Sequence, residues 1–240
     1  MKNNMRIIFY LFGDSICYGQ FVNPHQIWTT NLATSLNAIP NLEADVLFQN
    51  ASVNGNTTRQ ALERMHYDVT SHRPDYLMIQ FGINDSNYWA TDKKVPRVSK
   101  KAFVANLENM VERAVNSGTR HCFINTNHPL LKGEFEHFPE KTHSQTNAEY
   151  NDLIRMTHSN MANNQWPVTL IDIEATWDSY LEKNPIVSLG DLLLPDGVHL
   201  SVSGHNVYKK NIIPLILSKV KISEESNTPI TELRDHEGER

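Results

Sequence analysis

Short apolar runs alternate with longer amphipathic segments along most of this 240-residue chain. The runs are continuously apolar, which is typical of strands covered on both faces. The longer segments repeat apolar residues at helical spacing, as Phe103, Leu107 and Met110 do. This alternation predicts an α/β fold with a parallel sheet between two helical layers. We expect strands at residues 6–12, 45–50, 76–81, 121–125 and 168–173, and helices at 24–37, 57–69, 99–117, 145–161 and 204–219.

Composition indicates one folded domain with a distinct end. Hydrophobic residues make up 40% of the chain and charged residues 20%, as in globular proteins with a sizeable core. The net charge is -5, and residues 223–240 carry most of it, with six acidic residues against two arginines. We expect a single domain over residues 1–222 and a flexible acidic tail over 223–240. The net charge of -5 argues against nucleic acid as a partner, because nucleic acid favours basic faces.

The apolar runs and the cysteine content bear on the cellular location. No apolar stretch approaches the roughly 18 residues that a membrane span needs. The short N-terminal apolar run has no small-residue cleavage site after it, so it does not resemble a signal peptide. The two cysteines, Cys17 and Cys122, do not make a disulfide framework. We expect a cytoplasmic protein, and nothing in the sequence indicates its oligomeric state.

Polar, turn-forming residues follow each of the first four expected strands, at 13–15, 51–55, 82–85 and 125–128. Ligands of open α/β sheets bind beyond the carboxyl ends of the strands. We therefore expect these segments to share one rim and to form the site. Two long polar segments, 86–98 and 128–146, are candidates for its walls, because long loops in compact domains are often functional.

Ser15 is the candidate nucleophile at this rim. It stands in Gly13-Asp14-Ser15, directly after the first apolar run. Acyl transfer needs such a hydroxyl, a base, a group that orients the base and donors for the oxyanion. Gly-Asp-Ser is also a common turn sequence, so the triplet alone leaves both interpretations open.

The segment "PDGVHLS" supplies a candidate base and its partner, Asp196 and His199, just before the last expected helix. Within one turn the carboxylate can hold Nδ1–H of the imidazole and leave Nε2 facing Ser15. An ordinary turn with an unrelated histidine is the alternative, since the chain has 11 histidines.

Gly55 and Asn84 are the candidate oxyanion donors. Gly55 follows the second strand, where a bare backbone N–H can approach a ligand. Asn84 follows the third strand and offers a neutral amide donor, while the adjacent Asp85 is expected to bond nearby backbone N–H groups. Each of these signals alone is also typical of a plain turn.

Together, in this order and at these strand ends, the segments resemble the SGNH hydrolases, also called GDSL-like esterases and lipases. The resemblance spans residues 7–217, and one departure is Ile16-Cys17 in place of the leucine-led continuation of the first motif. The matching blocks are "GDS" at 13–15, "NASVNG" at 50–55, "GIND" at 82–85 and "DGVH" at 196–199.

The resemblance implies a three-layer α/β/α sandwich, flavodoxin-like, around a mostly parallel five-stranded sheet. It also implies that His199 removes the proton of Ser15 while Asp196 orients His199. The tetrahedral oxyanion then accepts hydrogen bonds from the N–H groups of Ser15 and Gly55 and from the side chain of Asn84. No metal and no organic cofactor is required.

The expected substrate is a small acyl ester, and an O-acetylated carbohydrate or sugar precursor is preferred. A short-chain acyl-ester or thioester hydrolase, lysophospholipase-like, is the alternative. Trp89, Phe135 and Phe138 lie in the two long segments and are candidates for stacking on a sugar or covering an acyl chain. Packing roles for these aromatic side chains are equally compatible with the sequence.

Other classes of protein fit less well. An ordinary α/β-hydrolase needs Gly-x-Ser-x-Gly, whereas Ser15 is followed by Ile16-Cys17. A non-catalytic binding module would not need Ser15, Asp196 and His199 together. An acyltransferase on the same fold stays open, because it would use the same residues.

A metal site was the remaining alternative. His128, His137 and His143 share one segment with Glu134 and Glu136, but no His-Glu-x-x-His or paired-cysteine motif accompanies them. Surface histidines near the cleft are the preferred interpretation.

Overall fold

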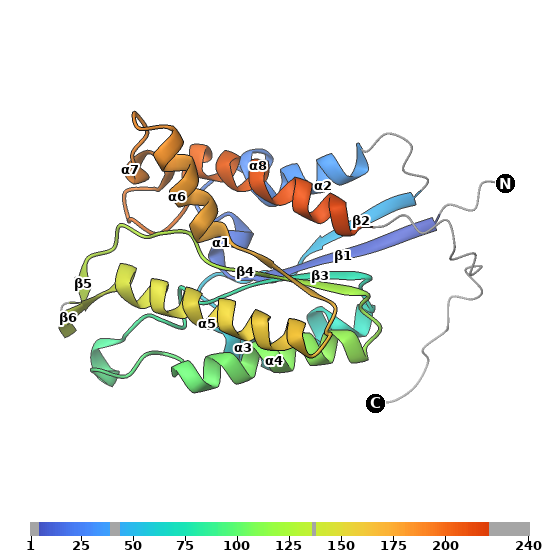
Figure 1. Cartoon of the computed structure of the whole chain (residues 1–240), viewed down its shortest axis with the longest axis horizontal. Coiled ribbons are helices and arrows are strands. Elements are labelled where there is room, and N and C mark those ends of the chain that lie inside the picture. The colour runs from blue at the N-terminus through green and yellow to red at the C-terminus, as the bar shows by residue number, and fades with distance from the viewer. Residues whose placement is uncertain (1–4, 39–43, 136–137, 221–240) are drawn as a thin grey trace.

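The five predicted strands form one parallel sheet in the order β2-β1-β3-β4-β7. The computed structural model describes residues 5–38, 44–135 and 138–220. With helices on both faces, the predicted three-layer α/β/α fold is confirmed (Figure 1). The strands are β1 (Met5–Gly13), β2 (Ala44–Asn50), β3 (Tyr76–Gln80), β4 (His121–Asn125) and β7 (Val168–Ile171).

Two apolar cores, one on each face of the sheet, explain why the strands read as continuous apolar runs. Along β1, Phe9 and Leu11 enter one core, whereas Tyr10 and Phe12 enter the other. Helices α2 (Trp28–Asn37), α6 (Ile173–Lys183) and α8 (Val202–Lys219) cover the first core, and α3 (Thr58–Asp68), α4 (Lys100–Asn116) and α5 (His143–Asn163) cover the second (Figure 1).

Side-chain caps set several helix boundaries. Thr57 accepts a hydrogen bond from the backbone of Gln60 and forms a capping box at the start of α3. The same box between Thr142 and Gln145 begins α5 at His143, two residues before the predicted start.

The apolar run in the last strand overestimates its length. β7 ends at Ile171, because the Asp172 carboxylate accepts a hydrogen bond from the N–H of Ala175 at 3.1 Å and caps α6. Ile173 is therefore a buried helical residue, not the strand end that we predicted.

Some short elements were not predicted. Two of them, a β-hairpin and a helical turn, lie in the long segments between the main elements, and the rim itself carries the short helix α1. The unpredicted short elements are α1 (Ser15–Tyr18), α7 (Leu189–Leu192), the hairpin strands β5 (Glu134–Phe135) and β6 (Phe138–Thr142), and 3₁₀ turns at Thr70–His72 and Ala90–Asp92. The helix predicted at 24–37 begins instead as a 3₁₀ turn, Pro24–Gln26, and its α-helical part starts at Trp28.

The domain boundary at residue 222 stays a prediction, because residues 221–240, which include the acidic tail, lie outside the described residues. Within the described residues, no helix combines the length and the apolar character that a membrane span requires.

Candidate active site

The polar segments that follow the strands meet at the carboxyl edge of the sheet, as predicted. The N–H of Val53, after β2, donates to the carbonyl of Gly13, at the end of β1, at 3.1 Å. Asn127, after β4, donates through its side chain to the carbonyl of Phe81, after β3, at 3.3 Å. Hydrogen bonds between neighbouring segments therefore tie this rim together.

Ser15 is fixed by the turn from β1 into α1. The Asp14 carboxylate caps α1 by accepting a hydrogen bond from the N–H of Ile16 at 3.0 Å, so Ser15 becomes the first helical residue. Gly13 allows this turn, because a Cβ there would lie 2.6 Å from Sγ of Cys17 and 2.9 Å from the carbonyl oxygen of Gln80. Ser15 is 7% exposed at the rim.

His199 and Asp196 complete a hydrogen-bonded chain with Ser15. Nε2 of His199 lies 3.0 Å from Oγ of Ser15, and Nδ1 lies 2.6 Å from Oδ2 of Asp196. A carboxylate at Nδ1 holds the imidazole proton there, so Nε2 is free to accept the hydroxyl proton. The geometry predicted for these three residues is present, across 184 positions of sequence.

The second oxygen of Asp196 shapes the loop that carries His199. Oδ1 accepts hydrogen bonds from the N–H groups of Val198 and His199, both at 2.9 Å. Partial burial acts to raise the pKa of Asp196, but the hydrogen bonds from the His199 side chain and from these N–H groups lower it overall. Asp196 is therefore a carboxylate at neutral pH.

Two buried histidines of the segment 128–146 hold rim loops in place. Nε2 of His128 donates to the carbonyl of Val198 at 2.8 Å, next to His199. Nε2 of His143 donates to the carbonyl of Ile83 at 2.9 Å, next to Asn84. Burial lowers the pKa of His128 to about 4 and also lowers that of His143, so both are neutral at pH 7.

This arrangement corrects the interpretation of these two histidines as surface residues: both are buried. In the part of the chain that the structure describes, no group of three or more His, Cys, Asp or Glu side chains is arranged to hold a metal ion. Of the remaining candidate ligands, Glu136 and His137 lie outside the described residues, as does the side chain of Glu134.

Asn84 and Gly55 belong to one hydrogen-bond network with Asp14. Nδ2 of Asn84 donates to Oδ2 of Asp14 at 3.2 Å. The guanidinium of Arg97 donates to Oδ1 of Asn84 at 3.3 Å and to the carbonyl of Gly55 at 3.1 Å. Because Asp14 precedes Ser15, this network gathers the three predicted oxyanion donors at the same end of the sheet.

Two buried carboxyl groups interact with this network, Asp14 as a member of it and Asp85 through the charge of Arg97. Burial raises the pKa of Asp14 to about 7 and that of Asp85 to about 6. Oδ1 of Asp85 accepts hydrogen bonds from the N–H and the hydroxyl of Thr58, the first residue of α3, which confirms its expected structural role.

Cys17 and Trp177 are packing residues. Both are fully buried, and burial raises the pKa of the Cys17 thiol well above its ordinary value. Trp177 packs on His128 and Tyr208 in the core beneath the loop of His199.

Phe21 is a site residue that the sequence did not indicate. Its ring packs edge-on against the imidazole of His199, with 5.2 Å between the centroids, yet 71% of the residue is exposed. Its φ of 69° lies in the left-handed region, which is unusual for a bulky residue and is often found at functional sites. No sequence pattern distinguishes such a phenylalanine from an ordinary loop residue.

The three aromatic residues predicted to bind substrate occupy different environments. Trp89 is half exposed and lies over the guanidinium of Arg97, at 4.6 Å from Cζ to the ring centroid. Phe135 is buried against Tyr88 and His143. Phe138 begins β6, and its side chain lies outside what the structure describes. Trp89 thus contacts Arg97, which in turn hydrogen-bonds to Asn84 and Gly55.

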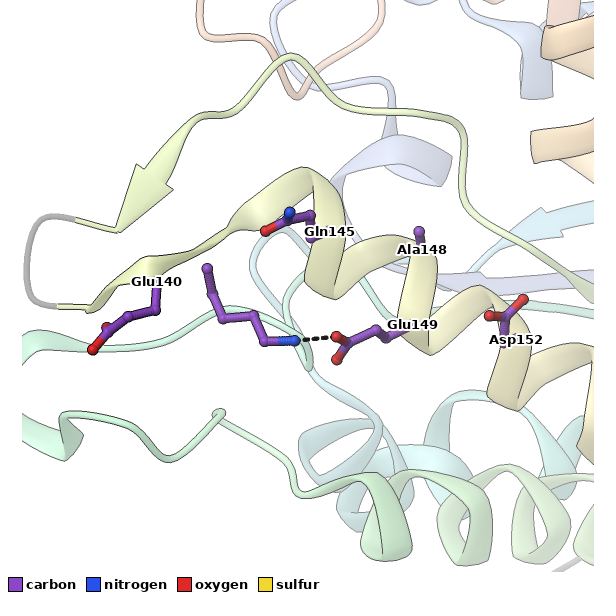
Figure 2. A pocket seen from close by; sticks show the side chains of 6 residues that line it. Glu140, Gln145, Ala148, Glu149 and Asp152 are labelled. Carbon is purple, nitrogen blue, oxygen red and sulfur yellow. Dashed lines mark hydrogen bonds and ion pairs between the residues drawn. The ribbon is translucent and has the colours of Figure 1, made fainter.

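A separate hollow lies between β6 and α5 (Figure 2). Its three carboxylates are all paired: Glu140 with Lys94 at 2.9 Å, Glu149 with Lys100 at 2.9 Å and with Lys141, and Asp152 with Arg155 at 3.0 Å. None of the residues of the Ser15–His199–Asp196 chain lines it. The lining residues are Glu140, Lys141, Gln145, Ala148, Glu149 and Asp152.

Comparison with known proteins identifies the class and the family. The model of the family described as GDSL-like lipase/acylhydrolase matches residues 9–212, most of the chain and all the segments of the rim. The chain is therefore a carboxylic-ester hydrolase. It belongs to the GDSL-like lipase/acylhydrolase family, the SGNH hydrolases, as its sequence motifs suggested.

Individual relatives are distant in sequence. The uncharacterized lipoprotein YqeF of Bacillus subtilis (strain 168) is 26% identical over 182 residues, which cover 68% of this chain and 70% of the relative. A lipase/acylhydrolase from Enterococcus faecalis is 25% identical, with a TM-score of 0.68 over 90% of this chain and 97% of its own. Axe2, an acetylxylan esterase from Geobacillus stearothermophilus, is 20% identical, with a TM-score of 0.70 over 90% and 96%. At that identity, Axe2 is evidence for the fold alone.

Proposed function

We propose that this protein is a serine esterase that removes small acyl groups, preferably acetyl groups, from a carbohydrate or sugar precursor. The observation that carries the proposal is the chain from Ser15 through His199 to Asp196, with heavy-atom distances of 3.0 and 2.6 Å. Family membership supplies the ester-hydrolase chemistry that this chain would perform.

In the proposed mechanism, His199 takes the proton of Ser15 as Oγ attacks the ester carbonyl. The carbonyl carbon becomes tetrahedral, and its oxyanion is stabilised by the N–H groups of Ser15 and Gly55 and by Nδ2 of Asn84. His199 then gives its proton to the leaving alcohol. Water attacks the acyl-enzyme by the same route, which releases the acid and restores Ser15.

The carbohydrate preference rests on the surroundings of the site and on the neighbours. Phe21 and Trp89 expose aromatic surface beside His199 and beside the Asn84–Arg97 network, where it can stack on a sugar. Two proteins with this fold, Axe2 and AlAXEase, are acetylxylan esterases. A cytoplasmic location, expected from the sequence, stays part of the proposal.

One observation favours the alternative, a short-chain acyl-ester or thioester hydrolase. Leu131 is 54% exposed and donates its N–H to the carbonyl of Gly197 at 2.9 Å, within the loop that carries His199. Leu131 and Phe21 are both exposed and both contact this loop, so they offer an apolar surface that an acyl chain can cover.

A series of substrates distinguishes the sugar deacetylase from the short-chain acyl-ester or thioester hydrolase. We expect kcat/KM to fall by about 10-fold or more from 4-nitrophenyl acetate to the octanoate, because a pocket shaped for acetyl excludes added methylenes. We also expect acetate release from acetylated xylo-oligosaccharides, followed by proton NMR, to exceed that from ethyl acetate. Activity that rises with chain length, or acetylated sugars that are not cleaved, would replace the sugar assignment with the alternative.

Asn84→Ala tests the oxyanion assignment. We expect kcat for 4-nitrophenyl acetate to fall by ~10²–10³-fold, because one oxyanion donor is lost. Asn106→Ala is the matched control: its amide donates to Thr58 at 2.9 Å, away from Ser15, so we expect activity close to that of the unaltered enzyme. An unchanged kcat in Asn84→Ala would remove the amide from this role.

A further inference from the structure

Arg97 contacts both residues that are proposed to flank the oxyanion. Its Nη1 donates to Oδ1 of Asn84 at 3.3 Å, and its Nη2 donates to the carbonyl of Gly55 at 3.1 Å. The planar guanidinium is suited to this task, because its donors point in fixed directions toward two separate acceptors. One cation therefore joins the loop after β2 to the loop after β3.

The contact with Asn84 determines which end of the amide faces the reaction. Oδ1 accepts from Arg97 while Nδ2 donates to Oδ2 of Asp14 at 3.2 Å, so the cation and the carboxyl group hold opposite ends of the amide. The second hydrogen on Nδ2 is then left for an oxyanion. Without Arg97, rotation of the amide would bring its carbonyl oxygen toward the developing negative charge.

The contact with Gly55 restrains the proposed donor that has the greatest intrinsic backbone freedom. Gly55 has a φ of 73°, and nothing lies within 4 Å of the position that a Cβ would occupy. Packing around this residue therefore does little to fix its backbone, and glycine has the largest conformational freedom of any residue. The hydrogen bond from Arg97 limits this freedom.

The positive charge of Arg97 is a third way in which this residue can favour the oxyanion. Asp14 and Asp85 are buried, and Oδ2 of Asp85 has no hydrogen-bond partner. An ionised carboxylate near a developing oxyanion opposes it. Arg97 interacts electrostatically with both acids, so its positive charge offsets theirs.

Arg97 is itself held in place. Its guanidinium lies under the ring of Trp89, 4.6 Å from the ring centroid, and its backbone N–H donates to the carbonyl of Asn87 at 2.9 Å. Arg59 donates to the carbonyl of Arg97 at 2.9 Å. These contacts hold Arg97 in a single arrangement before substrate arrives, which is what electrostatic stabilisation of a transition state requires.

We propose that Arg97 is a positioning residue that orients Asn84 and Gly55 for the oxyanion, with Trp89 as its support. The proposal rests on the proposed function, because it assigns a role within that site. It predicts that Arg97 affects the transition state and not the binding of the ground-state ester.

The experiment is a double-mutant cycle with 4-nitrophenyl acetate. We expect Arg97→Ala to lower kcat by about 10–10²-fold with KM changed less than about 3-fold, a loss smaller than that of a whole donor. In the Asn84→Ala background, the same substitution should lower kcat by less than about 3-fold, because much of its effect passes through Asn84. The kcat of Arg97→Lys should lie between those of the unaltered enzyme and Arg97→Ala, since an ammonium group keeps the charge but lacks the planar fork of donors.

Arg120→Ala is the matched control. Arg120 pairs with Asp75 at 3.0 Å through an exposed side chain, so this variant loses a cation and an ion pair of similar kind elsewhere. We expect its kcat to stay within about 2-fold of the unaltered enzyme. Added ethylguanidinium at millimolar concentration should partly restore the kcat of Arg97→Ala, should not restore that of Asn84→Ala, and should leave that of Arg120→Ala unchanged. A general loss of folding would not produce this pattern.

Three outcomes would overturn the proposal. They are an unchanged kcat in Arg97→Ala, a rise in KM at constant kcat, and an equal loss in the presence and absence of Asn84. If Arg97→Ala does not fold, as judged by circular dichroism, the cycle is run with Arg97→Lys and judged by the same criteria. Failure of the proposed function would look different: the unaltered enzyme would not cleave the ester, or Ser15→Ala would still cleave it.

Discussion

Ser15→Ala is expected to lower kcat for an aryl acetate on the order of 10⁶-fold, the largest effect of any single change, because no acyl-enzyme can form without the nucleophile. The structural consequence should be small. Oγ of Ser15 contacts Nε2 of His199, while the imidazole keeps its hydrogen bond to Asp196 and its packing against Phe21. The melting temperature should therefore change little, and steady-state kinetics with differential scanning calorimetry would establish both points.

Ser52→Ala provides the control for this variant. Ser52 is another buried serine after β2, on the same rim, so its substitution removes a hydroxyl from a similar environment. We expect Ser52→Ala to retain activity. A serine-directed phosphonate followed by peptide mass spectrometry should label Ser15 in the unaltered enzyme. Label on any other residue, or activity that persists in Ser15→Ala, would reject Ser15 as the nucleophile.

The sheet could be predicted from the sequence because strands buried on both faces appear as continuous apolar runs. A strand such as β3 is buried at every position, so its apolar run begins and ends close to the strand itself. The same pattern gave the wrong end for β7, because the buried Ile173 extends the apolar run into the helix that Asp172 caps. Helix α6 was not predicted. Its apolar residues pack in a core shared with α8, and such a contact between distant segments is not apparent from the local sequence.

The candidate site divides in the same way. The site residues found from the sequence lie in turns that follow strands or precede a helix, and the fold topology alone brings such turns to one rim. They are Ser15, Gly55, Asn84, Asp196 and His199. Contacts within that rim depend on side chains that arrive from elsewhere.

Three residues show this limit. Arg97 reaches Asn84 and Gly55 across 13 and 42 positions, and nothing in its neighbourhood marks it as different from other cations. Phe21 depends on a left-handed backbone that the sequence does not encode visibly. The sequence neighbours of His128 make it a candidate metal ligand, whereas its burial and its hydrogen bond to Val198 depend on the tertiary structure.

Asp196→Asn is expected to produce the second largest effect, a fall in kcat on the order of 10⁴-fold with little change in KM. Asparagine keeps an acceptor for the N–H groups of Val198 and His199, so the loop should retain its shape. Its amide nitrogen, however, would donate to Nδ1 of His199, where the carboxylate now accepts at 2.6 Å. The imidazole proton would then lie on Nε2, facing Ser15, and His199 would be unable to accept the hydroxyl proton.

Asp191→Asn is the matched control, because Asp191 also accepts from a backbone N–H and a side chain in the same region, at 2.8 and 2.7 Å from Ser188, without contacting His199. We expect this variant to stay within a few fold of the unaltered enzyme. Combining Asp196→Asn with Ser15→Ala should add almost nothing to the loss in Ser15→Ala, since both substitutions disable one proton transfer. If Asp196→Asn retained activity within about tenfold, or if its loss multiplied that of Ser15→Ala, the carboxylate would be a cap of the loop and not the group that orients His199.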